Sequence, residues 1–377
     1  MSVLAKGQVR PKPRTSYMAQ VILALLAGIL VLASAASAQA QQNGIGRATF
    51  TRRTCAKSGL AGGTCYRAVV SHCPETEGDF AAAVKINEAP DIDLLQGVVF
   101  FTTGGGGTAF YDSDVSYKNA ACPQSNCGLM VVQQINQANY RTVQIDFADP
   151  ENLISEPSGW LTGPSTDGPR ALACRYATIV HEVWALLFSS DNTHPVCATG
   201  NSGGSALVTY AITQYGMGNS SGPGPMFAFA EATSGPPYGR IDHGCAGAAA
   251  PVLDVSCPAG TQLSEDYGLE NARDYVDPAY PTDVCTQDIN SGGVDVYSQF
   301  HHDSVVSDDY PAPSYQTVVR TLFGSEDISA AMPLGLEWYN AVTSTKTNAC
   351  IVGAPHELPS NYDGATTIID DMTSLCK

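Results

Sequence analysis

The sequence predicts an α/β fold, in which a central, mostly parallel β-sheet is flanked by helices. Short runs of apolar and β-branched residues, typical of buried strands, alternate along the chain with longer segments of helical periodicity. A Gly-x-Ser-x-Gly motif falls at the junction between one such strand and the helix that follows it. Alternation on this scale implies parallel strands joined by crossover helices.

Four segments in the first part of the chain have the character of strands. Residues 46–55 and 64–73 are expected to form an opening hairpin. Residues 97–103, with the sequence GVVFFTT, are apolar, β-branched and aromatic, which is typical of a buried strand. Four glycines follow it at 104–107. Residues 140–147 form a further predicted strand.

The middle of the chain is expected to continue as helix, strand, helix and strand. Residues 169–188 form a predicted helix, which a proline opens and whose apolar residues recur at helical spacing. Residues 194–199 form a short strand, 203–216 a helix that a glycine stops, and 226–232 another strand.

The pattern breaks down between about residues 234 and 298. Glycine, proline, aspartate, tyrosine and three cysteines dominate there, without strong periodicity. Because so long an insert in a compact domain is usually functional, we expect a lid or cap. Regularity returns with a strand at 315–324 and a helix at 333–342, and then with a strand at 348–352 and a helix at 363–376.

The N-terminus has the organisation of a secretory signal peptide. Four basic residues lie within the first 14 positions, and an apolar run at 21–36 is followed by Ala38-Gln39-Ala40, which has the small-x-small shape of a cleavage site. The run is shorter than the roughly 20 residues that a membrane anchor needs. We therefore expect cleavage near Ala40, export to the outside or the periplasm, and no stable membrane anchor afterwards. Residues 41–377 would then form one domain that carries the insert.

Twelve cysteines, an even number, fit an oxidising compartment. No Cys-x-x-Cys pair occurs, so neither a zinc ribbon nor a thioredoxin-like site is indicated. Sequence does not fix disulfide connectivity. Proximity along the chain makes four local pairs plausible: Cys55–Cys65, Cys122–Cys127, Cys174–Cys197 and Cys350–Cys376.

The chain is strongly acidic. Without the first 40 residues, 15 basic residues stand against 36 acidic ones, for a net charge of −21. This charge argues against nucleic acid or an anionic membrane as a partner. It does not restrict a neutral substrate.

Ser202 is the predicted nucleophile. It lies between the predicted strand and helix, within Gly200-Asn201-Ser202-Gly203-Gly204, which is the context of a nucleophile elbow. The turn is sharp, so glycine is required at Gly200 and Gly204. It would expose the serine oxygen above the sheet and leave the Gly203 amide free at a helix N-terminus, where developing negative charge is favoured.

A serine hydroxyl needs a base, and His356 is the predicted one. In this architecture the base follows the final strand. His243 lies in the insert, and His301 and His302 precede the next-to-last strand. Only His356, in the loop sequence GAPHELP, follows the final strand.

The base needs a carboxylate to hold its tautomer. Asp327 is the predicted acid because it lies just beyond the strand that ends near residue 323. Glu326, one position earlier, is the second choice. Glu231, at the end of the preceding strand, is the third.

The order Ser202, Asp327, His356, together with the elbow, resembles the α/β-hydrolase superfamily. The resemblance covers about residues 97–376. It implies an α/β-hydrolase fold with a cysteine-containing lid, and hydrolysis through an acyl-enzyme.

The same resemblance implies an oxyanion hole. Residues 97–107 are similar to the strand-to-loop segment of the superfamily, with threonine where His-Gly-Gly-Gly motifs have histidine. An amide of Gly104, Gly105 or Gly106 would then complement the Gly203 amide. Which of the three donates stays open.

His301, His302 and Asp303 form a possible metal cluster, but adjacent histidines point in different directions and no third ligand motif is visible, so no metal is expected. No cofactor is expected either. Trp160 follows the strand at 140–147 and is a candidate to line a cleft.

The sequence thus predicts a secreted serine hydrolase that cleaves carboxylic esters of small molecules or polymers. A peptidase of the same fold and a non-catalytic extracellular binding protein are the alternatives. The oligomeric state is left open.

Overall fold

The computed structural model describes most of the chain from residue 44 onward. The described residues are 44–55, 59–148, 159–161, 168–190, 193–220, 222, 224–246, 257, 276–280, 284–285, 297–307 and 315–377. The predicted signal peptide at 1–40 lies outside them.

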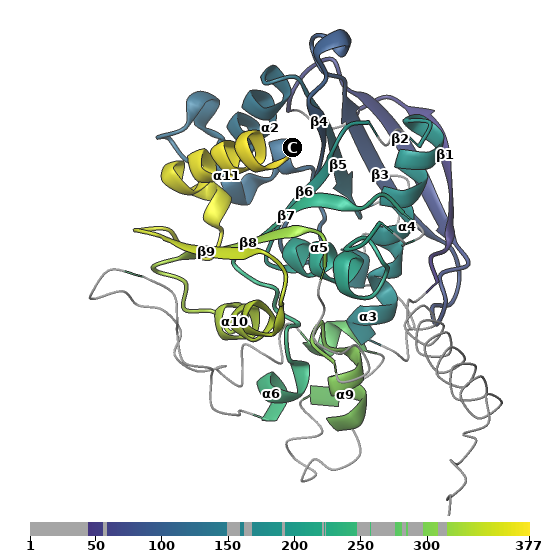
Figure 1. The fold of residues 1–377 in the computed structure, drawn as a ribbon, viewed down its shortest axis with the longest axis vertical. Coiled ribbons are helices and arrows are strands. Elements are labelled where there is room, and N and C mark those ends of the chain that lie inside the picture. The colour runs from purple at the N-terminus through teal and green to yellow at the C-terminus, as the bar shows by residue number, and fades with distance from the viewer. Residues whose placement is uncertain are drawn as a thin grey trace, which may run out of the picture. The chain divides into compact units, whose positions relative to one another are not determined.

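Nine strands of the described chain form one sheet in the order β1-β2-β3-β5-β4-β6-β7-β8-β9 (Figure 1). The strands are β1 (Arg47–Arg53), β2 (Thr64–Ser71), β3 (Phe80–Asn87), β4 (Gly97–Thr102), β5 (Tyr140–Asp146), β6 (Val196–Asn201), β7 (Phe227–Thr233), β8 (Val318–Gly324) and β9 (Lys346–Ile351). From β1 to β5 the pairs are antiparallel, and from β5 to β9 they are parallel. The predicted mostly parallel α/β fold and the opening hairpin are therefore confirmed.

Helices cover both faces of the sheet (Figure 1). Helices α2 (Cys127–Gln137) and α11 (Tyr362–Leu375) share one apolar cluster with the side chains of one sheet face. Helices α4 (Cys174–Glu182) and α5 (Gly203–Thr213) belong to the cluster on the other face. Central strand β4 is buried along its whole length, which explains its unbroken apolar sequence.

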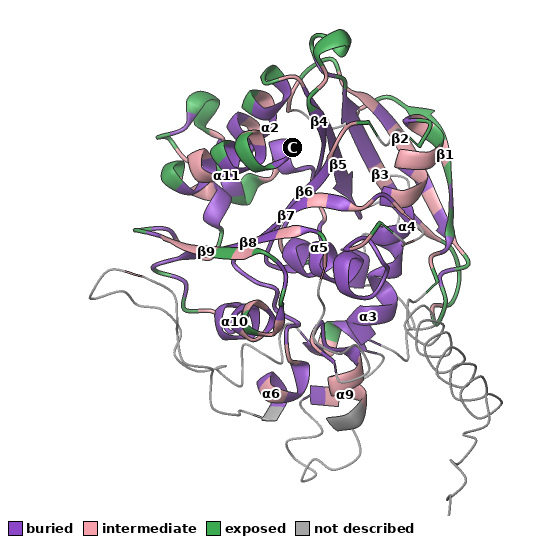
Figure 2. Ribbon diagram, viewed as in Figure 1, coloured by how far each residue is buried: buried purple, intermediate pink, exposed green. Residues whose placement is uncertain are grey.

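Helix α5 is buried at every position from Gly203 to Thr213, and Figure 2 shows it as one of the most enclosed elements. Its first residues are small, so its N-terminus approaches the sheet closely. A Cβ atom on Gly204 would lie 2.6 Å from the carbonyl oxygen of Thr103, next to β4. This contact fixes the start of the helix that follows Ser202.

The predicted helix at 169–188 is divided. It consists of α3 (Gly168–Leu172), α4 and a π-helical turn at Val183–Leu187, with a break at Ala173. The helix predicted at 333–342 is α10 (Ala331–Ala341). Strand β3 and helix α2 have no counterpart among the sequence-based predictions.

The described part of the predicted lid at 234–298 contains short helical segments. Helix α6 (Ile241–Ala246) lies within it, and α9 (Tyr297–Asp303) begins at its end. Much of the remainder lies outside the described residues. In α9, Asp303 accepts a hydrogen bond from Tyr280 and pairs with the buried Arg170 at 3.4 Å, so its carboxylate joins this region to α3.

Six disulfides connect all twelve cysteines, which indicates an oxidising environment. The predicted pairs Cys55–Cys65 and Cys122–Cys127 are confirmed. The other four pairs are Cys73–Cys174, Cys197–Cys376, Cys245–Cys285 and Cys257–Cys350.

The predicted pairs Cys174–Cys197 and Cys350–Cys376 are wrong, and the layers explain the first of them. Cys174 lies on α4, on one face of the sheet, while Cys197 points from β6 into the cluster on the opposite face. The sheet separates the two sulfurs. Cys376 directly follows α11, on the same face as Cys197, and so becomes its partner.

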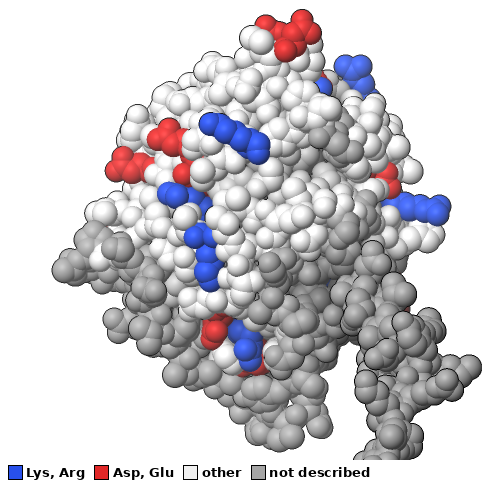
Figure 3. All heavy atoms as spheres, in the orientation of Figure 1, with Lys and Arg blue, Asp and Glu red and all other residues white. Residues whose placement is uncertain are grey.

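On the face drawn in Figure 3, acidic and basic side chains are scattered among neutral ones rather than gathered in one patch. Within the described residues, none of the helices combines the length and apolarity that crossing a membrane requires.

Candidate active site

Ser202 occupies a strained turn between β6 and α5. Its φ of 51° and ψ of −116° lie in a region that residues with a Cβ rarely adopt. The Ser202 amide donates to the carbonyl oxygen of Thr233, 2.8 Å away at the end of β7, which holds the turn on the sheet. A Cβ atom on Gly200 would lie 2.4 Å from the backbone of Gly204, so the turn closes only with glycine at that position. This is the local geometry predicted for an elbow.

His356 and Asp327 lie in contact. The Nδ1 atom of His356 is 2.9 Å from Oδ2 of Asp327 and 2.9 Å from Oγ of Ser329. Asp327 is fully buried, and its second carboxylate oxygen accepts from the Ser329 amide at 2.9 Å. Asp327 follows β8 and His356 follows β9, and these strands are parallel neighbours, so their carboxyl ends meet at one edge of the sheet.

Gly324 allows the two loops to approach each other. A Cβ atom at this position would lie 2.4 Å from the carbonyl oxygens of both Ala354 and Pro355. The Gly353 amide also donates to Ser325 Oγ at 2.8 Å. Small residues at the end of β8 and directly after it thus bring the loop of His356 against that of Asp327.

The environment of His356 favours its charged form. Burial by itself lowers the pKa of the imidazole, but the hydrogen bond and negative charge of Asp327, with a smaller contribution from Glu357, outweigh it. The pKa of His356 is therefore raised above the ordinary value of 6.5.

The other two predicted acids lie elsewhere. Glu326 is exposed. Glu231 is fully buried in β7, accepts a hydrogen bond from Thr199 Oγ1 at 3.0 Å and faces Asp371 of α11. Burial, followed by the charge of Asp371, raises the pKa of Glu231 well above its usual range. Of the three acids, Asp327 is the one hydrogen bonded to His356.

Ser202 and His356 line the same cleft, which has a volume of about 370 Å³. Asp327 lies behind His356 and is not among the lining residues. The lining residues are Gly104, Gly105, Thr108, Asp114, Ser116, Tyr117, Asn201, Ser202, His356 and Glu357.

The glycine run after β4 forms one side of this cleft. Gly104 and Gly105 line it, whereas Gly106 is absent from its lining. Gly203 packs so closely on this loop that a Cβ atom there would lie 2.0 Å from the Gly105 carbonyl oxygen. The predicted oxyanion residues Gly203, Gly104 and Gly105 therefore lie together beside Ser202.

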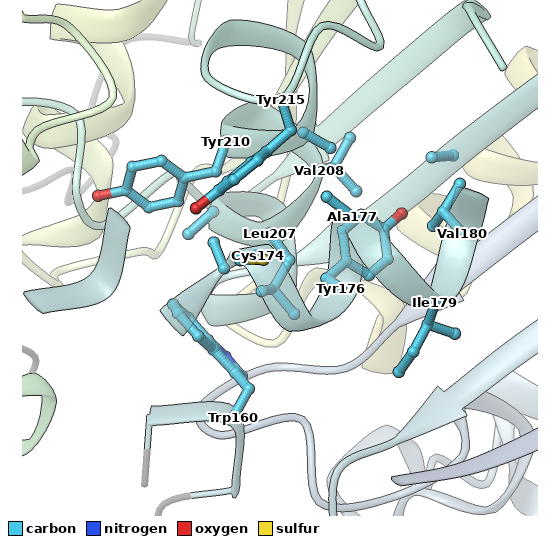
Figure 4. Packing of buried hydrophobic residues seen from close by; sticks show 14 of the residues in the cluster. Trp160, Cys174, Tyr176, Ala177, Ile179, Val180, Leu207, Val208, Tyr210 and Tyr215 are labelled. Carbon is cyan, nitrogen blue, oxygen red and sulfur yellow. The ribbon is translucent and has the colours of Figure 1, made fainter. Parts of the chain in front are cut away.

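Trp160 supports the glycine run from behind. Its indole Nε1 donates to the Gly105 carbonyl oxygen at 3.2 Å, and its amide donates to that of Gly106 at 2.9 Å. The side chain is fully buried in the apolar cluster of Figure 4. The expectation that Trp160 lines a cleft is wrong, because it packs inward beneath the loop.

Comparisons with known proteins give structural matches only. No protein-family model and no curated protein matches the sequence. Among solved structures, acetyl xylan esterase 1 from Thermoanaerobacterium sp. JW/SL YS485 matches with a TM-score of 0.50 and 12% identity, over 88% of this chain and 89% of that one. An acylaminoacyl peptidase from Pyrococcus horikoshii matches with a TM-score of 0.52 and 11% identity, over 86% of this chain and 51% of that one. The chain has the α/β-hydrolase fold.

Within this α/β-hydrolase fold, Ser202, Asp327 and His356 follow β6, β8 and β9 respectively. The carboxyl ends of parallel strands are where open α/β sheets bind ligands. Sequence reasoning missed the wall formed by Thr108, Asp114, Ser116 and Tyr117. The one feature of the sequence that could have identified these residues is their position. They follow a glycine run at a strand end, so their segment must pass this edge of the sheet.

Proposed function

We propose that the chain is a serine hydrolase that cleaves carboxylic esters through an acyl-enzyme on Ser202. The observation that carries the proposal is the 2.9 Å contact between His356 and Asp327, made by a histidine that lines one cleft with Ser202. The strained backbone of Ser202 supports it further, because such strain is characteristic of nucleophile elbows.

The chemistry follows from which nitrogen of His356 is engaged. Asp327 accepts a hydrogen bond from Nδ1–H of His356, which leaves Nε2 to take the proton of Ser202 as the serine oxygen attacks the ester carbonyl carbon. The carbonyl electron pair moves onto oxygen, beside the Gly203 amide and the glycine run. His356 then protonates the leaving alcohol, and a water repeats the sequence to release the acid and restore Ser202.

An ester fits the chain better than a peptide. The match to the acetyl xylan esterase spans most of both chains, whereas the match to the acylaminoacyl peptidase leaves about half of that protein without a counterpart. The cleft, at about 370 Å³, is near the lower end of ligand pockets, which suits a small or medium acyl group. Esters of plant polysaccharides, phenolic esters and polyesters are the proposed substrate classes.

Secretion is part of this proposal. The disulfides indicate an oxidising compartment, and the N-terminal 40 residues have the composition of a signal peptide. Expression with residues 1–40 included should yield an exported protein that begins near Gln41. N-terminal sequencing of that product tests the cleavage site.

Ser202→Ala tests the mechanism. Wild type should hydrolyse p-nitrophenyl acetate and butyrate and react with a fluorophosphonate, and Ser202→Ala should lose both by several orders of magnitude. Ser116→Ala is the matched control, since Ser116 also lines the cleft, and it should remain active. Wild-type turnover by Ser202→Ala would refute the assignment. A folded wild type that neither reacts with the fluorophosphonate nor hydrolyses esters would indicate a binding protein. Faster cleavage of an aminoacyl-proline amide than of the esters would indicate a peptidase.

A further inference from the structure

Tyr117 is a second polar side chain held rigidly at the cleft. It ends the short helix η3 (Val115–Tyr117) and lines the cleft together with Ser202 and Gly104. The residue is only 1% exposed. Its ring lies 4.9 Å from that of Tyr111, which in turn lies 5.2 Å from the ring of Phe101 in β4. This stack joins the ring to the central strand, so its position is fixed by packing.

The hydroxyl of Tyr117 is buried without a hydrogen-bond partner in the described part of the chain. Buried polar groups are nearly always hydrogen bonded, and the exceptions require an explanation. The Gly104 amide lies close enough to the phenol oxygen to lower its pKa, but the two groups do not have the geometry of a hydrogen bond. The hydroxyl therefore lies beside the glycine run with its donor capacity unused.

The hydroxyl also keeps its proton. Burial raises the pKa of Tyr117 well above 10, and the charges of Tyr111 and Asp114 raise it further. The Gly104 amide lowers this pKa, but burial and the neighbouring charges outweigh it. At any working pH the group is a neutral donor, not a base.

We propose that Tyr117 is a further catalytic residue, whose hydroxyl donates a hydrogen bond to the substrate oxygen that becomes negative when Ser202 attacks. This inference rests on the proposed function of Ser202. The Tyr117 proton stays on its own oxygen throughout: the carbonyl electron pair moves onto the substrate oxygen, and it returns when the alcohol leaves. A donor held in place before the reaction is effective because it does not reorganise as charge develops.

Tyr111 provides a matched control. Its hydroxyl is also buried without a partner in the described part of the chain, and its ring is equally enclosed. Burial raises its pKa well above 10 as well. It differs from Tyr117 in one relevant respect, because it is not among the residues that line the cleft. The two Tyr→Phe variants therefore remove the same group from a residue that lines the cleft and from one that does not.

The experiment measures kcat and KM for p-nitrophenyl butyrate with wild type, Tyr117→Phe and Tyr111→Phe, each normalised to its fluorophosphonate-titratable fraction. Tyr117→Phe should lower kcat by about 10- to 100-fold and leave KM nearly unchanged. Loss of one oxyanion donor typically lowers kcat by about 100- to 1,000-fold, so the expected effect is at or below the lower end of that range. Its affinity for a boronic acid inhibitor should fall in parallel. Tyr111→Phe should change none of these. Both variants should keep the wild-type Tm, because neither loses a hydrogen bond.

Four outcomes are informative. A selective loss in Tyr117→Phe supports the proposal. Equal losses in both variants would overturn it, because they would reflect packing. Unchanged kcat in Tyr117→Phe would overturn it while leaving Ser202 as nucleophile, provided that Ser202→Ala is inactive. An active Ser202→Ala would instead remove the proposed function itself. Normalisation to titratable sites keeps the comparison valid if a variant folds in lower yield.

Discussion

Asp327 and His356, 29 positions apart in the chain, are joined by a 2.9 Å contact between Oδ2 and Nδ1 across the carboxyl ends of β8 and β9. The carboxylate is fully buried, while the imidazole is 19% exposed and faces the cleft of Ser202. An imidazole fixed by a buried acid on one side and open to a cleft on the other has the arrangement of a general base.

Asp327→Asn should therefore lower kcat by about 10³- to 10⁴-fold, because the amide favours the wrong tautomer of His356. Glu326→Gln is the control at the neighbouring exposed position, and it should keep wild-type activity. Steady-state kinetics on a p-nitrophenyl ester make the comparison. If Glu326→Gln is the inactive variant instead, the acid has been assigned wrongly.

The pH dependence should reflect the raised pKa of His356. The base acts when neutral, so kcat/KM should rise with pH through an apparent pKa above 6.5. The stabilisation that the charged imidazole gains from Asp327 is complete below about pH 6.5, the pKa in the unfolded chain. It is lost as pH rises through the higher folded-state pKa. An acidic limb centred below 6.5 would contradict this prediction.

Glu231→Gln should leave catalysis intact while changing the pH dependence of stability. Oε2 of Glu231 is buried without a donor among the described residues, and Glu231 faces Asp371, whose carboxylate pairs with Arg320 at 2.5 Å. Burial raises the pKa of Glu231, so its stabilising contribution is complete below about pH 4.5 and declines as pH rises through the folded-state pKa. Glutamine does not ionise.

The Tm of Glu231→Gln minus that of wild type should therefore increase with pH. Thermal unfolding followed from pH 4 to 9 measures this difference, and ester hydrolysis is assayed in parallel. Loss of activity at unchanged stability would show that Glu231, not Asp327, is the acid that matters.

The positions of Ser202, Asp327 and His356 were predictable because local rules fix them. A tight turn needs the glycines around Ser202, and parallel strands deliver the residues that follow them to one edge. Strand β3 was not predictable in the same way. Its run of alanines shows no alternation, and its buried Lys85 depends on a 2.7 Å ion pair with Asp112 that no sequence pattern reveals.

The wall that contains Tyr117 was missed for a related reason. Its position depends on the aromatic stack with Tyr111 and on contact with α2, where a Cβ atom on Gly128 would lie 2.8 Å from the Tyr117 ring. Long-range disulfides such as Cys197–Cys376 likewise depend on which face of the sheet each cysteine occupies. Such contacts arise from packing between distant segments of the chain. The hydrophobic periodicity of a sequence carries no information about them.

Gly324→Ala should impair catalysis without touching a reacting group. The added methyl group would meet two backbone carbonyl oxygens of the His356 loop at 2.4 Å, and backbone cannot rotate away as a side chain can. We expect a loss of about 1–3 kcal/mol of stability, as for other overpacked sites, and a fall in kcat at temperatures where the protein is fully folded. Gly353→Ala is a useful contrast, since nothing lies within 4 Å of its added Cβ although its φ is +68°. Equal kcat losses in the two variants would exclude a specific role for the Gly324 contact.

The charge of the cleft should select against anionic esters. Asp114 and Glu357 both line it, and His356 is the one basic side chain among the ten lining residues that the structure describes. Asp114 is held in place because its carboxylate accepts from the Ser116 amide and hydroxyl at 2.9 and 2.7 Å. Two like charges about 4 Å apart in water repel by about 1 kcal/mol. A free-energy difference of this size corresponds to a roughly 5-fold difference in kcat/KM. An ester with a carboxylate near the scissile bond should therefore be hydrolysed about 5-fold less efficiently than its neutral isostere.

Two controls separate charge from shape. Raising the ionic strength to about 1 M, where the Debye length is near 3 Å, should narrow the difference between the two esters. Glu357→Gln should narrow it at low salt. Because Glu357 contributes to the raised pKa of His356, kcat/KM for the neutral ester should be unchanged only at a pH where His356 is neutral in both proteins. A discrimination that persists unchanged in high salt and in Glu357→Gln must arise from the shape of the cleft, and the electrostatic explanation would then be discarded.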